Sequence, residues 1–244
     1  MISAHGRRSI RELTRRRARS FLTIATIAVA IAGVWLFAIP GNVESTLEER
    51  ARTDVMHTAR LAPAAADLSD DQVAALRAVD NVAGLDLRTL AVTEVRFDGR
   101  VQRVILVGVG DFDEQVVNVV NLDRGTFPAG SGEVMADSEN GRTSRLPAGI
   151  GDAVEIRTDT GEWTGFEVAG EGGTLRYSSE VANEAPVLYL SNDEVQRVMG
   201  YPAPNSIDVL ALEADRAAVE EMVAELRTIL DQQIADLAYW DVLE

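Results

Sequence analysis

Residues 85–109 read LDLRTLAVTEVRFDGRVQRVILVGV. Two runs rich in valine, leucine and isoleucine, 85–97 and 101–109, flank the dipeptide Asp98-Gly99. Asp-Gly is favoured in the two-residue turns of β-hairpins, because both turn positions need a positive φ. The stretch therefore predicts a long β-hairpin, and the other elements of the domain can be placed around it.

Upstream of the hairpin, the sequence predicts one strand and one helix. Ser69 and Gln72 have the spacing of a capping box, so a helix opens there. Its apolar face consists of Val73, Leu76 and Val79. Residues 54–61 alternate in the manner of a strand, with His57 among the apolar positions. This setting favours a half-buried structural histidine over a catalytic one.

Downstream of the hairpin, residues 116–172 hold short β-rich runs separated by glycine-containing turns. Val154 and Ile156 alternate ahead of a turn at 159–162, and Phe166 and Val168 alternate after it. Frequent turns between short strands predict a compact β-module here.

After this module the pattern returns to alternating strands and helices. Strands are predicted at 187–190 and 207–212, and Ser191 with Glu194 caps a short helix that ends near Gly200. Asp215 opens a long helix. Its apolar face comprises Val219, Met222, Val223, Leu226, Ile229, Leu230, Ile234 and Leu237.

These elements together predict an α+β fold. Its α+β parts, about 54–115 and 187–238, enclose an inserted small β-module at about 116–172. The predicted domain occupies residues 40–244.

The N-terminal region predicts one transmembrane helix. Residues 20–39, SFLTIATIAVAIAGVWLFAI, carry no charge and would span about 30 Å as a helix. The arginines that precede this run are Arg7, Arg8, Arg11, Arg15, Arg16, Arg17 and Arg19. Because arginines next to a span stay in the cytoplasm, residues 1–19 are predicted to be a cytoplasmic stub and residues 40–244 extracytoplasmic.

The alternative for this region is a cleaved secretory signal. The apolar stretch of such a signal is shorter, about 7–15 residues, and no small-x-small cleavage site follows residues 20–39. The sequence therefore favours an uncleaved anchor in the cytoplasmic (inner) membrane, with the N-terminus inside.

Composition excludes several functions. All 23 basic residues are arginine, so the chain has no P-loop lysine for ATP hydrolysis. It contains no cysteine, and its two histidines, His5 and His57, are predicted to lie on opposite sides of the membrane. Residues 40–244 carry a formal charge of −22. Such an acidic domain repels nucleic acid.

Carboxylate clusters are the remaining candidates for an enzymatic or metal site. Asp111, Asp113 and Glu114 form one cluster, which is typical of a solvated turn. Asp67, Asp70 and Asp71 form the other, at a helix start where acidic residues favour the helix dipole. We predict no enzymatic activity, no catalytic, cofactor-binding or metal-ligating residue, and no cofactor.

Two glycine pairs also resemble parts of a nucleotide-binding loop. Gly108-x-Gly110 and Gly170-x-Gly172 do not complete a dinucleotide fingerprint ahead of a helix, and both are interpreted as turns.

Four short motifs in the middle of the chain resemble a family. They are LDRGTFP (122–128), GEV (132–134), GDAVEI (151–156) and FEVAG (166–170). Their order resembles the Gly-Arg-x-Pro, Gly-Glu-Val, Gly-Asp-x-Val-x-Leu and Phe-x-Val-x-Gly thread of FtsX-like and MacB-like ABC transporter permeases. The arginine-rich stub, the single span and the order of elements are also similar to that family.

The chain departs from the family pattern in three ways. Arg124 and Gly125 stand in reversed order, and Ile156 replaces a leucine. Family permeases carry three more spans after the outer domain, whereas no second long apolar run occurs here before Glu244. Three interpretations stay open: a natural single-span variant, an N-terminal fragment of a longer permease, or a truncated reading frame.

The resemblance implies a permease subunit that couples ATP hydrolysis by a separate cytosolic P-loop ATPase to movement of the outer domain, in export or mechanotransmission. The expected partners are that ATPase, membrane lipid, and further copies or other subunits in a homo- or hetero-oligomer. The alternative is a free-standing single-span protein whose outer domain binds a ligand or an envelope protein.

Overall fold

The computed structural model describes residues 54–62, 68–140, 146–177 and 185–230. All of them belong to the second of the two units into which the chain divides, residues 51–244. The predicted stub and span, residues 1–39, lie outside the described residues. Among those described, no helix has the length and apolar character needed to cross a membrane.

Nine strands in the described part of the chain form one mixed sheet. They are β1 (Ala59–Leu61), β2 (Val82–Phe97), β3 (Arg100–Val109), β4 (Asn121–Gly125), β5 (Glu133–Asp137), β6 (Ala153–Arg157), β7 (Trp163–Gly173), β8 (Val187–Ser191) and β9 (Ser206–Ala211). The helices are α2 (Asp70–Arg77), α3 (Asn192–Met199), α4 (Arg216–Leu230) and the 3₁₀ helix η1 (Leu175–Tyr177). The prediction of a sheet-rich α+β domain is confirmed, while the span lies outside the described residues.

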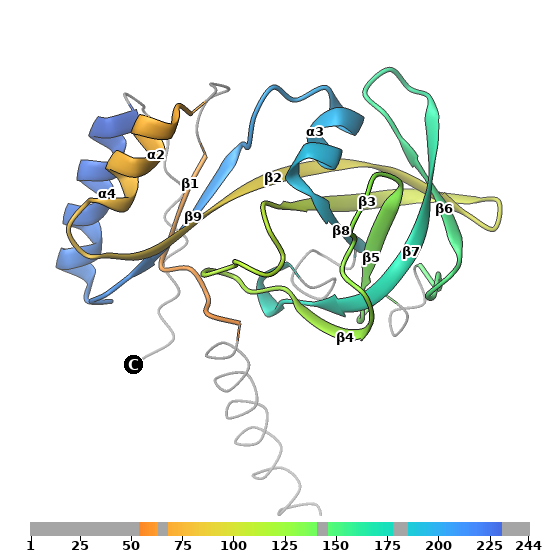
Figure 1. Ribbon diagram of the computed structural model, residues 1–244, viewed down its shortest axis with the longest axis horizontal. Coiled ribbons are helices and arrows are strands. Elements are labelled where there is room, and N and C mark those ends of the chain that lie inside the picture. The colour runs from red at the N-terminus through yellow and green to blue at the C-terminus, as the bar shows by residue number, and fades with distance from the viewer. Residues whose placement is uncertain (1–53, 63–67, 141–145, 178–184, 231–244) are drawn as a thin grey trace, which may run out of the picture. The chain divides into compact units, whose positions relative to one another are not determined.

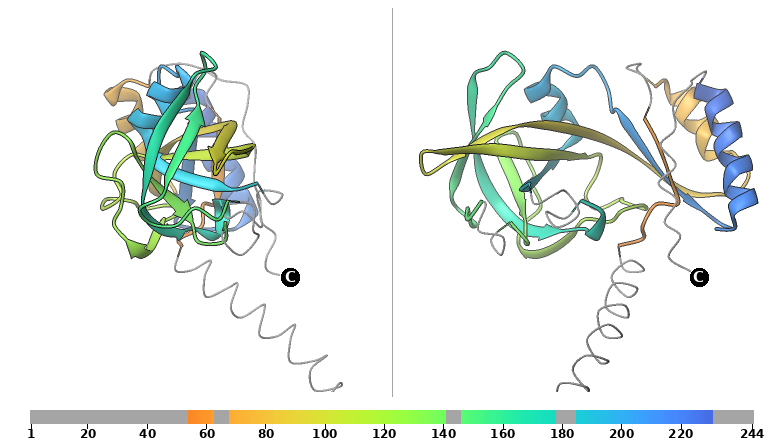
Figure 2. Two further views of the ribbon diagram at one scale, coloured as in Figure 1. Left: turned by 90° about the vertical axis from the view of Figure 1, so that its right-hand side faces the viewer. Right: turned by 180° about the vertical axis from the view of Figure 1, so that it is seen from behind.

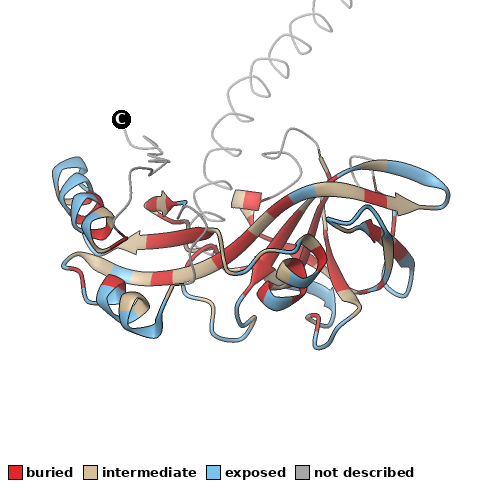
Figure 3. Ribbon diagram, turned by 90° about the horizontal axis from the view of Figure 1, so that it is seen from above, coloured by how far each residue is buried: buried red, intermediate tan, exposed pale blue. Residues whose placement is uncertain are grey.

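The predicted hairpin is confirmed as β2 and β3. Its turn contains Asp98 at φ 47° and Gly99 at φ 73°, and Phe97 pairs with Arg100 across it. The two positive φ values are those that the Asp-Gly dipeptide favours. The exposed end of the hairpin is visible in Figure 3.

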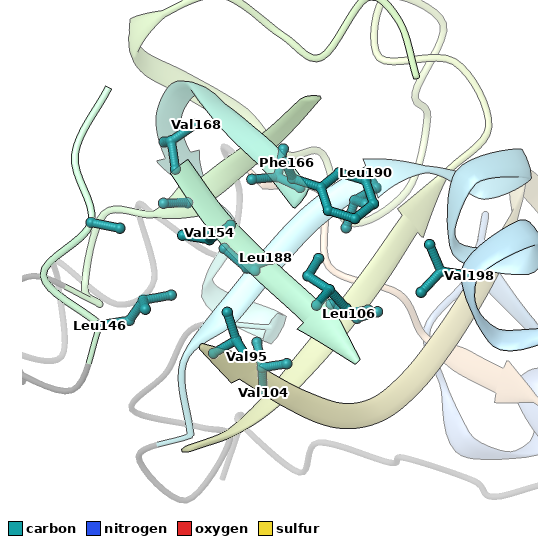
Figure 4. Packing of buried hydrophobic residues seen from close by; sticks show 14 of the residues in the cluster. Val95, Val104, Leu106, Leu146, Val154, Phe166, Val168, Leu188, Leu190 and Val198 are labelled. Atoms are coloured by element: carbon teal, nitrogen blue, oxygen red, sulfur yellow. The ribbon is translucent and has the colours of Figure 1, made fainter. Parts of the chain in front are cut away.

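Six strands close into a ring through the hydrogen-bonded order β2, β3, β8, β5, β7, β6 and back to β2. Buried apolar side chains fill its interior (Figure 4), so the ring is a packed core and not a channel. The ring combines strands from three segments of the chain: the hairpin, residues 116–172, and the segment that contains β8. The division into α+β parts and an inserted module stays a prediction.

The first half of β2 belongs to a second part of the domain, outside the ring. Residues 82–88 of β2 pair with β9, and β9 pairs with β1. Helices α2 and α4 contact each other and cover this part of the sheet (Figures 1 and 2). We call β1, β9, residues 82–88, α2 and α4 the helical layer. Its core contains Leu61, Leu76, Leu85, Ile207, Val209, Met222 and Leu226, all buried.

Helix ends match the predicted caps. Ser69 accepts a hydrogen bond from the backbone of Gln72, and the side chain of Gln72 accepts one from the backbone of Ser69. Gly200 ends α3 in the left-handed conformation at φ 64°. The side chain of Asp215 accepts from two backbone amides in the first turn of α4. These short-range signals fix the helices because each satisfies amides or carbonyls that the helix itself leaves free.

Two local predictions were wrong. The predicted strand at 54–61 is a strand only over β1, since Val55 takes a left-handed turn at φ 46° and its carbonyl accepts from the amide of Asn118. The glycine pairs lie mostly within strands. A Cβ on Gly108 would lie 2.6 Å from Asn192 Oδ1, and one on Gly172 would meet the carbonyl oxygen of Asn121. Gly108 therefore permits close packing of β3 against α3, and Gly172 close packing of β7 against β4.

Candidate functional site

The helical layer and the ring meet at a group of buried polar side chains. We call this group the junction network and define it as Asp54, His57, Arg60, Arg88, Asn118, Tyr177 and Asp208. Its members come from the segment before β1, from β1, β2 and β9, from the loop between β3 and β4, and from η1. Buried polar groups in such a network are costly unless they are hydrogen-bonded, so their contacts define what the junction holds together.

Asp208 of β9 is the centre of the network and is fully buried. Its carboxylate accepts from Arg60 Nε at 2.8 Å, from Asn118 Nδ2 at 2.6 Å and from the Tyr177 hydroxyl at 2.6 Å. Arg88 Nε lies 4.0 Å from the same carboxylate. One side chain thus joins the helical layer to the loop after β3 and to η1.

Electrostatics keep this carboxylate ionised. Burial by itself would raise the pKa of Asp208, but the charge of Arg60 and the hydrogen bonds from Arg60 and Tyr177 outweigh it and lower the pKa. Burial, followed by the charge of Asp208, raises the pKa of Tyr177, so its hydroxyl remains a donor. The guanidinium of Arg60 also lies 5.0 Å from the centroid of the Tyr177 ring and donates to the Tyr177 hydroxyl.

Asn118 ties the segment before β1 to Asp208. Its side-chain oxygen accepts from the backbone amide of His57 and lies 3.1 Å from His57 Nδ1. Its backbone amide donates to Val55, at 2.8 Å. Asn118 has a φ of 49° and is fully buried, and asparagine is one of the few residues that tolerate this conformation.

Arg88 fixes the loop after β3. Its side chain is 1% exposed, and Nη2 donates to the carbonyl of Val117 at 2.8 Å and to that of Asn118 at 3.3 Å. Asp86 on the same strand accepts from the backbone amides of Val116 and Val117, both at 2.9 Å. The loop is therefore held to β2 at the residue where β2 passes from β9 to β3.

Asp54 makes the corresponding link to the ring. Its carboxylate accepts from Thr174 Oγ1 at 3.2 Å, from the amide of Leu175 at 2.5 Å and from Asn121 Nδ2 at 2.8 Å. These partners stand at or next to the ends of β7 and β4. Residues 54–61 are consequently bonded both to the ring, through Asp54, and to the helical layer, through Arg60 and β1.

An open cleft of about 440 Å³ lies beside the junction. Its lining includes Arg77 of α2, Asp86 and Arg88 of β2, and Asn192 and Gln196 of α3. It is bordered by elements of both the helical layer and the ring, so a change in their arrangement would alter its width.

The structure describes most of the two predicted carboxylate clusters. Asp111 accepts from the backbone amide of Asp113 in an exposed turn. Asp70 and Asp71 occupy the first turn of α2, whereas Asp67 lies outside the described residues. Among the side chains described, no group of three or more His, Asp or Glu could hold a metal ion.

The sequence located His57 but not the network around it. His57 was predicted to be half-buried in a strand, whereas the structure has it 4% exposed and places it before β1. Asn118 and Asp208 were not predicted to have any role. The signal that could have found Asp208 is its position in an otherwise apolar run, Ser206–Ala211, where only a paired carboxylate is tolerated.

Comparison with known proteins gives structural matches alone. No protein-family model matches the chain, and neither does any curated protein. Among solved structures, the periplasmic region of MacB from Actinobacillus actinomycetemcomitans is similar at 14% identity and a TM-score of 0.51, over 77% of this chain and 91% of that one.

Two further solved structures are similar with lower scores. The extracellular domain of the ABC-type transporter YknZ from Gram-positive bacteria matches at 13% identity and a TM-score of 0.48, over 71% of this chain and 92% of that one. A domain of a putative permease protein from Porphyromonas gingivalis matches at 10% identity and a TM-score of 0.41, over 71% of each chain. The described domain therefore has the fold of a MacB-like periplasmic core domain.

Proposed function

We propose that this chain is a permease subunit, or the N-terminal part of one, in an ABC transporter complex. In this proposal a separate cytosolic P-loop ATPase hydrolyses ATP, residues 20–39 cross the inner membrane with the N-terminus inside, and the described domain moves on the extracytoplasmic side. The MacB-like fold supports this reading.

One observation supports the mechanical part of the proposal most. Residues 54–61 follow the predicted span by fifteen positions. Asp54 accepts a hydrogen bond from Thr174, which directly follows β7 of the ring, and Arg60 donates one to Asp208 of the helical layer. A displacement of this segment would therefore act on both parts of the domain at once. Rigid-body movement of packed parts about a bonded junction is a common form of conformational coupling.

The junction favours a role in transmission over one in catalysis. Its carboxylate and guanidinium groups are directed at one another and at backbone groups, and the carboxylate of Asp208 accepts three hydrogen bonds. Groups satisfied in this way hold a structure in one arrangement, and breaking one of them is expensive. Such an arrangement suits a junction that keeps its own geometry while the two packed parts attached to it move as rigid bodies.

A pull-down tests the proposal. The tagged full-length chain is recovered from its native membranes in mild detergent, and its companions are identified by mass spectrometry. We expect a P-loop ATPase in the eluate that is lost when residues 1–39 are replaced by an unrelated span. Recovery of the intact chain with no ATPase would contradict the proposal and favour a free-standing binding protein.

A further inference from the structure

His57 is a buried titratable group that the proposed movement does not itself require. It is 4% exposed and lies in the segment between the predicted span and β1. Its Nε2 atom is buried and has no hydrogen-bond partner among the described residues. A buried ring nitrogen without a partner is an exception that calls for a physical explanation.

The network fixes which nitrogen of His57 carries the proton. Asn118 Nδ2 donates to Asp208 at 2.6 Å, so the other atom of that amide, Oδ1, faces His57. Because Oδ1 only accepts, His57 Nδ1 must be the protonated nitrogen that donates to it. In neutral His57, Nε2 is then an unprotonated acceptor that receives no hydrogen bond from the described residues.

Protonation of His57 would place a hydrogen on Nε2 and a positive charge on the imidazole. No described acceptor lies within hydrogen-bonding distance of Nε2, so the new N–H group would be left without a partner. Burying an unpaired charged donor costs several kcal/mol unless the group reaches water. The least costly response is for the imidazole of His57 to leave its buried position, which breaks its contacts with Asn118.

Other charged groups around His57 act in both directions. The charge of Asp208 on β9 favours the protonated imidazole of His57, whereas the charges of Arg60 on β1 and Arg176 on η1 oppose it. Arg88 on β2 adds a further positive charge next to Asp208, and the Tyr177 hydroxyl already donates to Asp208. Burial is the largest influence and lowers the pKa of His57 from its ordinary value.

We propose that His57 is a pH-sensitive latch: its neutral imidazole holds the segment before β1 on Asn118, and protonation of the imidazole releases that segment from the junction network. The protonation step stands on its own, whereas its consequence for transmission rests on the proposed function. Since the extracytoplasmic side follows the external pH, the latch would loosen coupling in acid.

The direction of the pH effect follows from linkage. A histidine whose pKa is lowered in the closed state binds fewer protons there than in the open state, which titrates near the ordinary value of about 6.5. The closed state is therefore stable above that value and is progressively lost as the pH falls below it. For an open-state value of about 6.5, one proton raises the opening constant by up to about tenfold at pH 5.5.

Hydrogen exchange on the full-length chain in detergent tests the latch. We expect the protection factors of the Asn118 and Val119 amides, corrected for intrinsic exchange, to fall several-fold between pH 7.5 and 5.5. His57→Gln should abolish that pH dependence, and His5→Gln, the matched control at the other histidine, should retain it. A fall of less than twofold in the wild type, or the same fall in His57→Gln, would overturn the proposal.

Nitrogen-15 histidine spectra provide a second readout that does not depend on a variant at position 57. Because the chain has only two histidines, all histidine signals of the His5→Gln variant come from His57. We expect a neutral ring protonated at Nδ1 that titrates below the ordinary value. A neutral imidazole protonated at Nε2, or a titration midpoint at or above pH 6.5, would refute the latch. Both measurements use the chain alone, so absence of an ATPase partner would leave them unaffected.

Discussion

Replacing Asp208 by asparagine tests whether the junction network holds the domain together. The three donors around this carboxylate, Arg60 Nε, Asn118 Nδ2 and the Tyr177 hydroxyl, lie at 2.8, 2.6 and 2.6 Å. An amide of the same size would turn its own donor towards at least one of them. It would also remove the carboxylate charge that lies 2.8 Å from Arg60 Nε and 4.0 Å from Arg88 Nε, at a position where Asp208 itself is fully buried.

Removing one partner of a buried ion pair costs about 3–5 kcal/mol, because the remaining charge is left uncompensated. For a domain of this size each kcal/mol shifts the unfolding midpoint by about 2–4 °C, so Asp208→Asn should lower it by roughly 6–20 °C. The assay is thermal unfolding of the full-length chain in detergent, followed by tryptophan fluorescence. The Trp163 side chain on β7 reports on the ring.

The matched control is Glu220→Gln, which breaks an exposed pair with Arg216 on α4. Exposed helical pairs of this spacing contribute about 0.5 kcal/mol or less, so the control should unfold within about 2 °C of the wild type. If Asp208→Asn unfolded as close to the wild type as the control does, the network would not be a structural link, and the reasoning from its contacts would be wrong.

Three further substitutions test the fold. Ser69→Ala removes the capping box of α2 and should cost about 1 kcal/mol in chemical denaturation, with Ser69→Thr largely restoring it. Ile156→Ala opens a cavity in the ring and should cost about 2–5 kcal/mol; a cost below 1 kcal/mol would mean that the ring is loosely packed. Gly108→Ala places a Cβ against Asn192 and Thr89 and should cost about 1–3 kcal/mol, whereas Gly99→Asn at the open hairpin turn should be nearly neutral.

Local elements were predictable because their signals are short-range. Asp98-Gly99 predicted the hairpin, Ser69 with Gln72 predicted the start of α2, and Gly200 predicted the end of α3. Each signal acts within a few residues through positive φ or through free backbone amides. Their structural consequence does not depend on the rest of the chain.

The arrangement of the strands was not predictable in the same way. The ring closes through β6, which pairs with both β2 and β7, and β8 runs parallel to β3. These pairings join residues far apart in the sequence, and strand pattern alone does not specify which partner a strand takes. The sequence therefore predicts short strands within residues 116–172 but not that they share one ring with β2, β3 and β8.

The junction network was missed for a related reason. Asp208 is 90 positions from Asn118 and 148 from Arg60, and no local motif contains two of these residues. Only the folded chain shows that their charges and hydrogen bonds are mutually satisfied. The glycine pairs illustrate the same limit, since Gly108 was interpreted as a turn residue when its real constraint is the distant side chain of Asn192.

In the proposed function, movement of the segment after the predicted span rearranges the ring against the helical layer. The absence of cysteine allows spin labels to be placed at Arg100→Cys on the hairpin and Glu225→Cys on α4, both exposed. The distance between the labels would be measured in the proposed complex with a cytosolic ATPase, with and without a non-hydrolysable nucleotide. We predict a shifted distance distribution with nucleotide, whereas an unchanged distribution in a complex that hydrolyses ATP would contradict the claim.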